Sequence, residues 1–455
     1  MNGNHEYNNV IPIHNTKDHR EEELLYQYSD NPYFNLYFNY MNIDVNTEVP
    51  VTCHRWCALS VLAVLLGRRI TLPFGNTQIL PNLYIQMIGD PATRKSTAIN
   101  LAKGVLKKYS FDNFAPKRTS LEKYLLDLHE LTWGKEVEGK GSAADDDFLF
   151  EELAVSKKKQ AEDLPVAESF ICNDEFVDFI GRSNLDFIST LGTFWDIDEV
   201  FDQALKHSKP VYINKPTINI LSGNTITGFN KAFPSDIQDQ GFFSRLLIIH
   251  VEPTGKKVDF PVSSGVEITK ELIAYLRAIQ NTCVGNFTMD ASERELCGKI
   301  YRTWEPIQDS RFAHYSGRRY TQMLKLSMLI AASNIRTEIT CEDIVLGNTI
   351  LSFAEYTMPT ALGEFGRARS SPVIHKIITM VEKATRPVQM SEIIAEVYMD
   401  MDNIAGVGAI VKSLVMAGKI RFEKEGIFPV KKVWLTEDTE LVKPSLLTDY
   451  ERGLK

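Results

Sequence analysis

The sequence predicts an α/β fold with a mostly parallel sheet at its core, and three observations point to it. Four short runs rich in apolar and β-branched residues alternate with helical segments, in the order "LYIQMIG", "SFICNDEF", "TINILSGN" and "RLLIIHV". This alternation is typical of parallel strands joined by helices. Helical periodicity continues after the last run, over residues 265–365. At 455 residues the chain is also longer than one compact core, so we expect several domains.

The expected organisation has four parts. They are an N-terminal helical segment, the α/β core, a helical lid and a C-terminal domain, over residues 1–54, 55–262, 263–365 and 366–455. We expect a helix near residues 20–28, then an amphipathic helix over residues 51–69 that leads into a short strand at "RRITLPFG". The charged, glycine-containing stretch 136–148 is predicted to be a surface insertion, and residues 363–372 a linker.

The composition is that of an ordinary soluble globular protein, with 44% hydrophobic and 24% charged residues. The longest apolar helix candidate, Trp56 to Leu66, is too short to span a membrane and is predicted to be core. The first residues lack the order of a signal peptide, so we expect a cytoplasmic protein that does not contact membranes. The six cysteines are scattered, which favours buried thiols over a metal site or disulfides. The net charge of −9 decides little, because an acidic protein can still be basic along one surface.

The stretch "NLYIQMIGDPATRKSTAIN" has the pattern of a phosphate-binding loop between a strand and a helix. Such a pattern also occurs by chance, but its position here lets backbone N–H groups and the helix N-terminus face an anion. Lys95 is expected to reach the terminal phosphates, and Ser96 to ligate Mg²⁺. Arg94 stands where a glycine normally lets the backbone curl around the phosphates. The predicted nucleotide-binding residues are Gly89, Asp90, Pro91, Ala92, Thr93, Arg94, Lys95, Ser96 and Thr97.

Three further positions follow in an order that suits nucleotide hydrolysis. Asp174 and Glu175 end an apolar run, where the first could hold the metal and the second could polarise water. Asn224 ends the next run and could lie between phosphate and water, and Arg245 opens the last run and could reach a neighbouring subunit's nucleotide. Each position also has a plainer interpretation. The acids favour a helix N-terminus, the asparagine a turn, and the arginine a surface ion pair.

The ordered set Gly89…Lys95-Ser96, Asp174-Glu175, Asn224, Gly241…Ser244-Arg245 resembles the AAA+ ATPase core. It is most similar to the ATPase domain of phage, plasmid and mobile-element replicative helicases, a group akin to superfamily 3 and the MCM helicases, over about residues 55–355. The resemblance implies an AAA+ P-loop core in which Lys95 and Ser96 bind phosphate and Mg²⁺ and Asp174 and Glu175 form the Walker B pair. It further implies that Asn224 is sensor 1 and Arg245 an arginine finger acting in trans. Sensor 2 would be an arginine of "HYSGRRYTQ", with Arg319 favoured over Arg318. Arg94 is the departure from the family pattern.

Two segments are candidates for contact with DNA. In "FDQALKHSKPVYINKPTINIL", two β-like runs flank the tip "KHSKP", and Lys206 and His207 match the pore-hairpin lysine and histidine of superfamily 3 helicases, with Lys209 nearby. Lysines at such a tip can neutralise phosphates without reading bases, although the tip could equally be a solvated loop.

The second candidate is the C-terminal pattern of three helices and a hairpin, which is that of a winged helix-turn-helix domain. Its presumed recognition helix and wing are only modestly basic, so contact with protein remains an alternative. The polar residues in question are Lys412, Ser413, Lys419, Arg421, Lys424, Lys431 and Lys432.

We therefore expect an ATP-dependent replicative DNA helicase of a phage or mobile element, using ATP and Mg²⁺ in the bacterial host cytoplasm. Its expected partners are single-stranded DNA, further copies of itself in a ring, most simply a hexamer, and a separate primase or other replication proteins. One alternative is an AAA+ helicase loader or replication initiator, which would hydrolyse ATP without unwinding DNA. Another is a regulator that binds ATP poorly because of Arg94 and acts through its winged helix.

Overall fold

The computed structural model describes most of the chain. The described residues are 31–42, 48–134, 157–205, 210–233, 241–307, 309–362, 371–384, 386–397, 405–416, 419–423 and 426–429. Several predicted features lie outside them: the helix near residues 20–28, the insertion 136–148, most of the linker 363–372, the hairpin residues Lys206, His207 and Lys209, and the wing residues Lys424, Lys431 and Lys432. The chain divides into two compact units, one within Met1–Gly363 and the other within Glu364–Pro444.

The first unit is built on a parallel four-stranded sheet with the order β4-β7-β3-β8. Its strands are β3 (Tyr84–Ile88), β4 (Glu168–Asn173), β7 (Thr217–Asn224) and β8 (Leu246–His250). Each of the four apolar runs is a strand of this one sheet, so the predicted α/β fold with a parallel sheet is confirmed. A parallel bridge between Phe114 and Phe170 adds a further short segment beside β4.

The register decides which ends of the strands meet. Ile88 pairs with Asn224 on one side and His250 on the other, and Asn173 pairs with Ser222. Because all four strands are parallel, their last residues lie along one edge of the sheet, here called the carboxyl edge. Their first residues lie along the opposite, amino edge.

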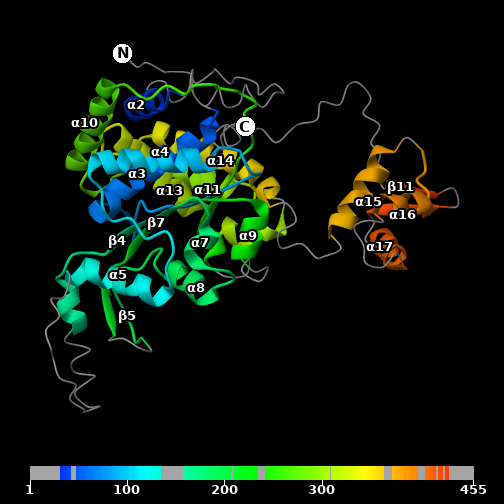
Figure 1. The fold of residues 1–455 in the computed structure, drawn as a ribbon, viewed down its shortest axis with the longest axis horizontal. Helices are drawn as coiled ribbons and strands as arrows, with labels where there is room; N and C mark the ends of the chain where they lie inside the picture. The colour runs from blue at the N-terminus through cyan, green and yellow to red at the C-terminus, as the bar shows by residue number, and fades with distance from the viewer. Residues whose placement is uncertain are drawn as a thin grey trace, which may run out of the picture. The chain divides into compact units, whose positions relative to one another are not determined.

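Helices cover both faces of this sheet (Figure 1). On one side lie α2 (Pro32–Met41), α3 (Val51–Leu66), α4 (Lys95–Tyr109) and α10 (Val266–Thr282), and on the other α5 (Leu121–Trp133), α7 (Phe176–Ile180) and α8 (Leu185–Thr193). The expectation that residues 51–69 form an amphipathic helix is wrong in one respect. From Thr52 to Leu66 every residue is buried, because α3 packs against the sheet as well as against α2, α4, α10 and α13 (Arg319–Ser333). The prediction of Trp56 to Leu66 as core is correct.

Two antiparallel hairpins lie outside this four-stranded sheet. The antiparallel pair β5 (Val200–Gln203) and β6 (Val211–Asn214) is the hairpin that the sequence predicts just before β7. The predicted strand at "RRITLPFG" is β1 (Ile70–Phe74), which pairs with β2 (Thr77–Ile79) and β9 (Gly285–Asn286).

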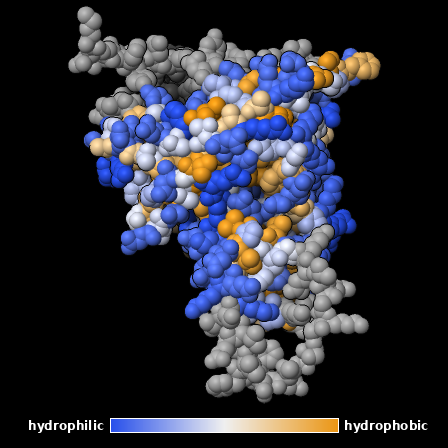
Figure 2. Space-filling view, turned by 90° about the vertical axis from the view of Figure 1, so that its left-hand side faces the viewer, coloured by the Kyte–Doolittle hydropathy of each residue, from blue (hydrophilic) through white to orange (hydrophobic). Residues whose placement is uncertain are grey.

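The described residues between 265 and 362 are mainly helical, as expected. After α10 come α11 (Ala291–Thr303), α12 (Ala313–Ser316), α13 and α14 (Cys341–Leu362), and α14 packs on β8. The unit also contains the short helices α9 (Ile226–Ala232), η1 (Gly67–Arg69), η3 (Phe243–Arg245) and η4 (Ser310–Phe312). Every helix within the described ranges is too short or too polar to cross a membrane. Hydrophilic side chains predominate on the face drawn in Figure 2, and the hydrophobic ones form small, separate patches.

The second unit contains helices α15 (Ser371–Lys383), α16 (Met390–Val397) and α17 (Ala405–Met416) and the antiparallel hairpin β10 (Ile420–Glu423) and β11 (Gly426–Pro429). Val388, just before α16, exchanges two backbone hydrogen bonds with Ile427 and so adds a third short segment to the hairpin. The unit has its own hydrophobic core, formed by Val373, Ile377, Val381, Val388, Ile393, Val397, Val407, Val411, Leu414, Ile420 and Ile427.

Candidate active site

The loop from Gly89 to Arg94 joins β3 to α4 at the carboxyl edge of the sheet. A Cβ atom at Gly89 would lie 2.0 Å from the carbonyl oxygen of Val251, so only glycine fits at this position. The backbone N–H of Gly89 donates to the carbonyl oxygen of Asn224 at 3.3 Å, and the N–H of Val251 donates to that of Ile88 at 2.8 Å. Both neighbouring strands therefore fix the point where the loop begins.

The Lys95 side chain is folded back under this loop. Its Nζ donates to the carbonyl oxygens of Gly89 and Asp90 and to Thr93 Oγ1, each at 2.8 Å. Burial lowers the pKa of the Lys95 ammonium group, because the charge is partly removed from water. The geometry thus concentrates a positive charge at the base of the loop.

The start of α4 is open to an anion. Helix α4 begins at Lys95 without a capping hydrogen bond from a side chain, and Ser96 and Thr97 are exposed in its first turn. The unpaired N–H groups of a helix start carry partial positive charge, which favours phosphate or carboxylate groups there. This end of α4 therefore has the chemistry of a phosphate site.

Arg94 adopts the conformation of the glycine that it replaces. Its φ of 63° and ψ of 16° are left-handed, so the backbone of the loop turns as a glycine would allow. The guanidinium group points to Glu48: Nε donates to Glu48 Oε2 at 2.7 Å, and Nη2 donates to the same oxygen. The arginine is thus engaged with Glu48 through its side chain.

The two acids stand directly after β4, at the same edge of the sheet. Asp174 is half-buried and accepts a hydrogen bond from Asn100 Nδ2 of α4 at 3.2 Å, whereas Glu175 is exposed. A Cβ atom at Gly223 would lie 2.7 Å from the Asp174 carbonyl oxygen and 3.6 Å from Lys95 Cβ. Gly223 therefore allows the acidic pair and the phosphate loop to approach each other across β7.

Asn224 ends β7, the strand that lies between the phosphate loop and the acidic pair. The side chain is buried, and its Nδ2 donates to Gln86 Oε1 at 2.7 Å. Its Oδ1 has no hydrogen-bond partner among the described residues. A buried oxygen without a partner is costly, so this site is suited to a donor such as water.

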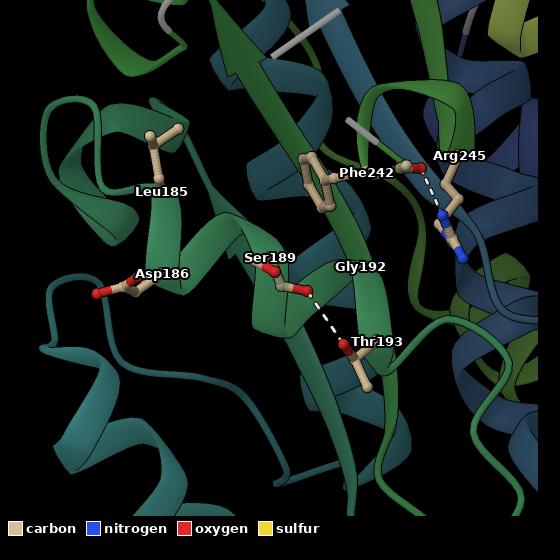
Figure 3. A pocket seen from close by; sticks show the side chains of 8 residues that line it. Leu185, Asp186, Ser189, Gly192, Thr193, Phe242 and Arg245 are labelled. Atoms are coloured by element: carbon tan, nitrogen blue, oxygen red, sulfur yellow. Dashed lines mark hydrogen bonds between the residues drawn. The ribbon is translucent and has the colours of Figure 1, made fainter. Parts of the chain in front are cut away.

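Arg245 lies at the amino edge, away from the phosphate loop of its own chain. It precedes the five-residue strand β8, which corresponds to about 17 Å along the sheet. Together with Gly241 and Phe242 it lines a hollow of about 430 Å³ whose other wall is α8, with Leu185, Asp186, Ser189, Gly192 and Thr193 (Figure 3). Arg245 Nη1 donates to the carbonyl oxygen of Gly241 at 2.5 Å, while its Nε has no hydrogen-bond partner in the described part of the chain.

Positive charge gathers at this amino edge. Asp196 lies 3.9 Å from Arg245 Nη2 and 3.3 Å from Arg318 Nη1, so two arginines share one carboxylate. Burial, with Arg318 as a smaller cause, lowers the pKa of Arg245. Burial lowers the pKa of Lys325 well below the usual value. Lys325 also interacts electrostatically with Asp196 and with both arginines.

Arg318 and Arg319 have different environments. Arg319 is buried, its Nε donates to Glu355 Oε1 at 2.9 Å, and its guanidinium lies 4.9 Å from the centre of the Trp304 ring. Arg318 is 37% exposed and reaches Asp196 beside Arg245. Burial therefore argues against the preference for Arg319 over Arg318, because Arg319 is already enclosed by its own ion pair.

Two classes of residues take part in this geometry without having been predicted. Gln86 hydrogen-bonds to Asn224, and Asn100 hydrogen-bonds to Asp174. Gln86 could have been predicted, because it is a polar residue inside an otherwise apolar strand. Glu48 and Asp196 pair with arginines distant in the sequence, and local patterns carry no information on such pairs. The described residues contain no group of three or more His, Cys, Asp and Glu side chains placed to hold a metal ion.

The comparisons with known proteins add no assignment. No protein-family model matches the chain, and a search of curated proteins found no match.

Proposed function

We propose that this protein is an AAA+ ATPase that works as a ring-shaped replicative DNA helicase of a phage or mobile element. The order of strands in the sheet carries the proposal. Because β7 lies between β3 and β4, Asn224 stands between the Lys95 loop and the Asp174-Glu175 pair. A water bound near Asn224 would then have the phosphate on one side and a carboxylate base on the other, which hydrolysis requires.

The residues at the carboxyl edge fit Mg–ATP as ligand. Lys95 and the open start of α4 would hold the terminal phosphates, and the Ser96 hydroxyl and Asp174 would hold the metal. Bound Mg–ATP supplies the transferable phosphoryl group and a cation that offsets its charge. Asn224 would orient the attacking water through its Oδ1, which has no partner within the described ranges, and Glu175 would accept the proton of that water.

The amino edge supports assembly into a ring. Arg245 is at the far edge of the sheet from its own phosphate loop, so it could reach a nucleotide only on a neighbouring copy. The charges of Arg245 and Arg318, with one shared acid between them, would attract that phosphate. In this proposal Arg245 is the arginine finger in trans, and exposure favours Arg318 over Arg319 as the second arginine.

Two further features support a DNA-dependent motor. The hairpin β5–β6 directly precedes the Asn224 strand, so movement around the nucleotide could be passed to its tip, with Lys206, His207 and Lys209. The second unit has the helices, hairpin and added short segment expected of a winged helix, with Lys412, Lys419 and Arg421 exposed.

ATP hydrolysis measured with and without single-stranded DNA tests the proposal, comparing the wild-type protein with Lys95→Ala. We expect turnover that DNA stimulates and that the variant loses. Absence of turnover under both conditions would favour the alternative hypothesis, a regulator that binds ATP poorly and acts through its winged helix.

Replacing Lys206 and His207 separates the helicase from a loader or initiator. If the hairpin drives translocation, the double variant Lys206→Ala/His207→Ala should lose unwinding of a forked DNA while keeping its basal ATPase. Equal loss of both activities would indicate a structural role for the tip. A wild-type protein that hydrolyses ATP but never unwinds DNA would favour the loader.

A further inference from the structure

Arg94 stands in a conformation that disfavours any residue with a Cβ atom, directly before the catalytic lysine. Two non-glycine residues of this short loop have positive φ, Ala92 at 66° and Arg94 at 63°. Left-handed backbone is strained for such residues and persists where the surroundings hold it. The loop therefore needs contacts that hold its last turn in place.

The Arg94 side chain provides one such contact, through Glu48. Nε and Nη2 both donate to Glu48 Oε2, and the side chains are 51% and 24% exposed. A partly exposed ion pair between two mobile side chains would stabilise little.

Glu48, however, is itself anchored. Its Oε1 accepts the backbone N–H of Val258 at 3.1 Å, and its own carbonyl oxygen accepts the Thr254 hydroxyl at 3.2 Å. The hydrogen bond from Val258, followed by that from Arg94, lowers the pKa of the Glu48 carboxyl group, so it is ionised at neutral pH. The anchor belongs to the same segment as Val251, whose carbonyl oxygen packs against Gly89. One segment thus secures both ends of the phosphate loop.

We propose that Glu48 is a positioning residue for the phosphate loop, holding Arg94 in the turn that a glycine adopts in this kind of loop. The inference rests on the proposed function as an ATPase. Glu48 does not touch the nucleotide in this proposal; it acts through Arg94. It follows that the effect of the Glu48 carboxylate on the phosphate loop should depend on the arginine at residue 94.

A double-mutant cycle tests this dependence, with the proteins Glu48→Gln, Arg94→Gly and the combination of both. The readouts are the dissociation constant of a fluorescent methylanthraniloyl-ATP and the steady-state KM and kcat for ATP. We expect Glu48→Gln to raise the dissociation constant about two- to fivefold, the size of a partly exposed ion pair, with kcat nearly unchanged. Arg94→Gly should bind as tightly as wild type or tighter, and adding Glu48→Gln to it should change nothing.

Glu392→Gln is the matched control. Glu392 forms a comparable pair with Arg386 and also accepts a backbone N–H, from Gln389, but it lies in the second unit. Its replacement should leave nucleotide binding unchanged. Equal weakening by Glu48→Gln in the arginine and glycine backgrounds would overturn the proposal, as would no weakening in either.

Hydrogen exchange separates this inference from the proposed function. Without nucleotide, the amides of residues 92–98 should exchange faster in Glu48→Gln than in wild type, and this difference should vanish in the Arg94→Gly background. Unchanged exchange overturns the role of Glu48. Nucleotide binding that does not depend on Lys95 would instead overturn the ATPase assignment.

Discussion

The two edges of the central sheet carry opposite halves of one proposed reaction. At the carboxyl edge, neighbouring strands bring together a lysine, an acidic pair and an amide whose oxygen has no hydrogen-bond partner among the residues that the structure describes. At the amino edge, Arg245 and Arg318 share Asp196 beside an open hollow. In the proposed function, the carboxyl edge would bind and hydrolyse a nucleotide, whereas the amino edge would attract the nucleotide of a neighbouring copy.

If Arg245 takes part in hydrolysis, the proposed site needs two copies of the chain. A strand of five residues separates the two edges, and side chains do not bridge about 17 Å. The catalytic unit would therefore be the interface between two copies.

Removing the arginine from the amino edge should have the largest effect. Arg245→Ala should lower kcat about 10³- to 10⁵-fold, the range known for arginine fingers, without weakening nucleotide binding to the same chain. Mixing it with Lys95→Ala should restore part of the activity, because some interfaces then combine an intact lysine with an intact arginine. Turnover at varied mixing ratios measures this.

The control for that mixture is the double variant Lys95→Ala/Arg245→Ala mixed with Lys95→Ala, which has no intact lysine and should stay inactive. If the first mixture recovers nothing at any ratio, Arg245 does not act in trans.

At the carboxyl edge, Glu175→Gln should lower kcat about 10²- to 10⁴-fold, because an amide cannot accept the proton of the attacking water. Lys95, Ser96 and Asp174 are untouched, so binding of ATP should persist. Equilibrium binding of ATP and single-turnover hydrolysis, both measured on this variant, distinguish a loss of binding from a loss of catalysis. Near-normal turnover would refute the role of Glu175 as the base.

The two adjacent arginines should differ in what they stabilise. Arg319→Ala removes the Arg319 ion pair from the buried Glu355, so we expect a loss of about 3–5 kcal/mol in the free energy of unfolding. Arg318→Ala should leave thermal unfolding nearly unchanged and lower ATP turnover. Denaturant titration and turnover on both variants check the assignment; the reverse pattern would return the sensor role to Arg319.

The smallest effect is expected from Asp196→Asn. In the proposed function, Asp196 would compete with an incoming phosphate for Arg245 and Arg318, and a partly exposed ion pair contributes at most about 1 kcal/mol. We therefore expect KM for ATP to fall up to about fivefold, and less at high salt. A loss of activity as large as that of Arg245→Ala would show instead that Asp196 orients the arginine.

Much of the carboxyl edge could be predicted because its signals are local. Each of these signals lies within a few consecutive residues: the four apolar runs, the loop after the first run and the polar residues that end the others. Strand propensity acts over the same short range. The hairpin before β7 was predictable for the same reason. The helix predicted over residues 51–69 shows where local patterns fail. We expected one polar face, but α3 is buried on all sides because helices distant in the sequence cover it.

The strands, the loop and the side chains that end each strand could therefore be predicted from local sequence patterns. Only the tertiary structure decided that β7 lies between β3 and β4, that Arg94 pairs with Glu48 and that Arg319 is enclosed by Glu355. The physical reason is the distance along the sequence over which each interaction acts. Backbone preference and periodicity act over a few residues, whereas strand order and buried ion pairs depend on which distant segments pack together.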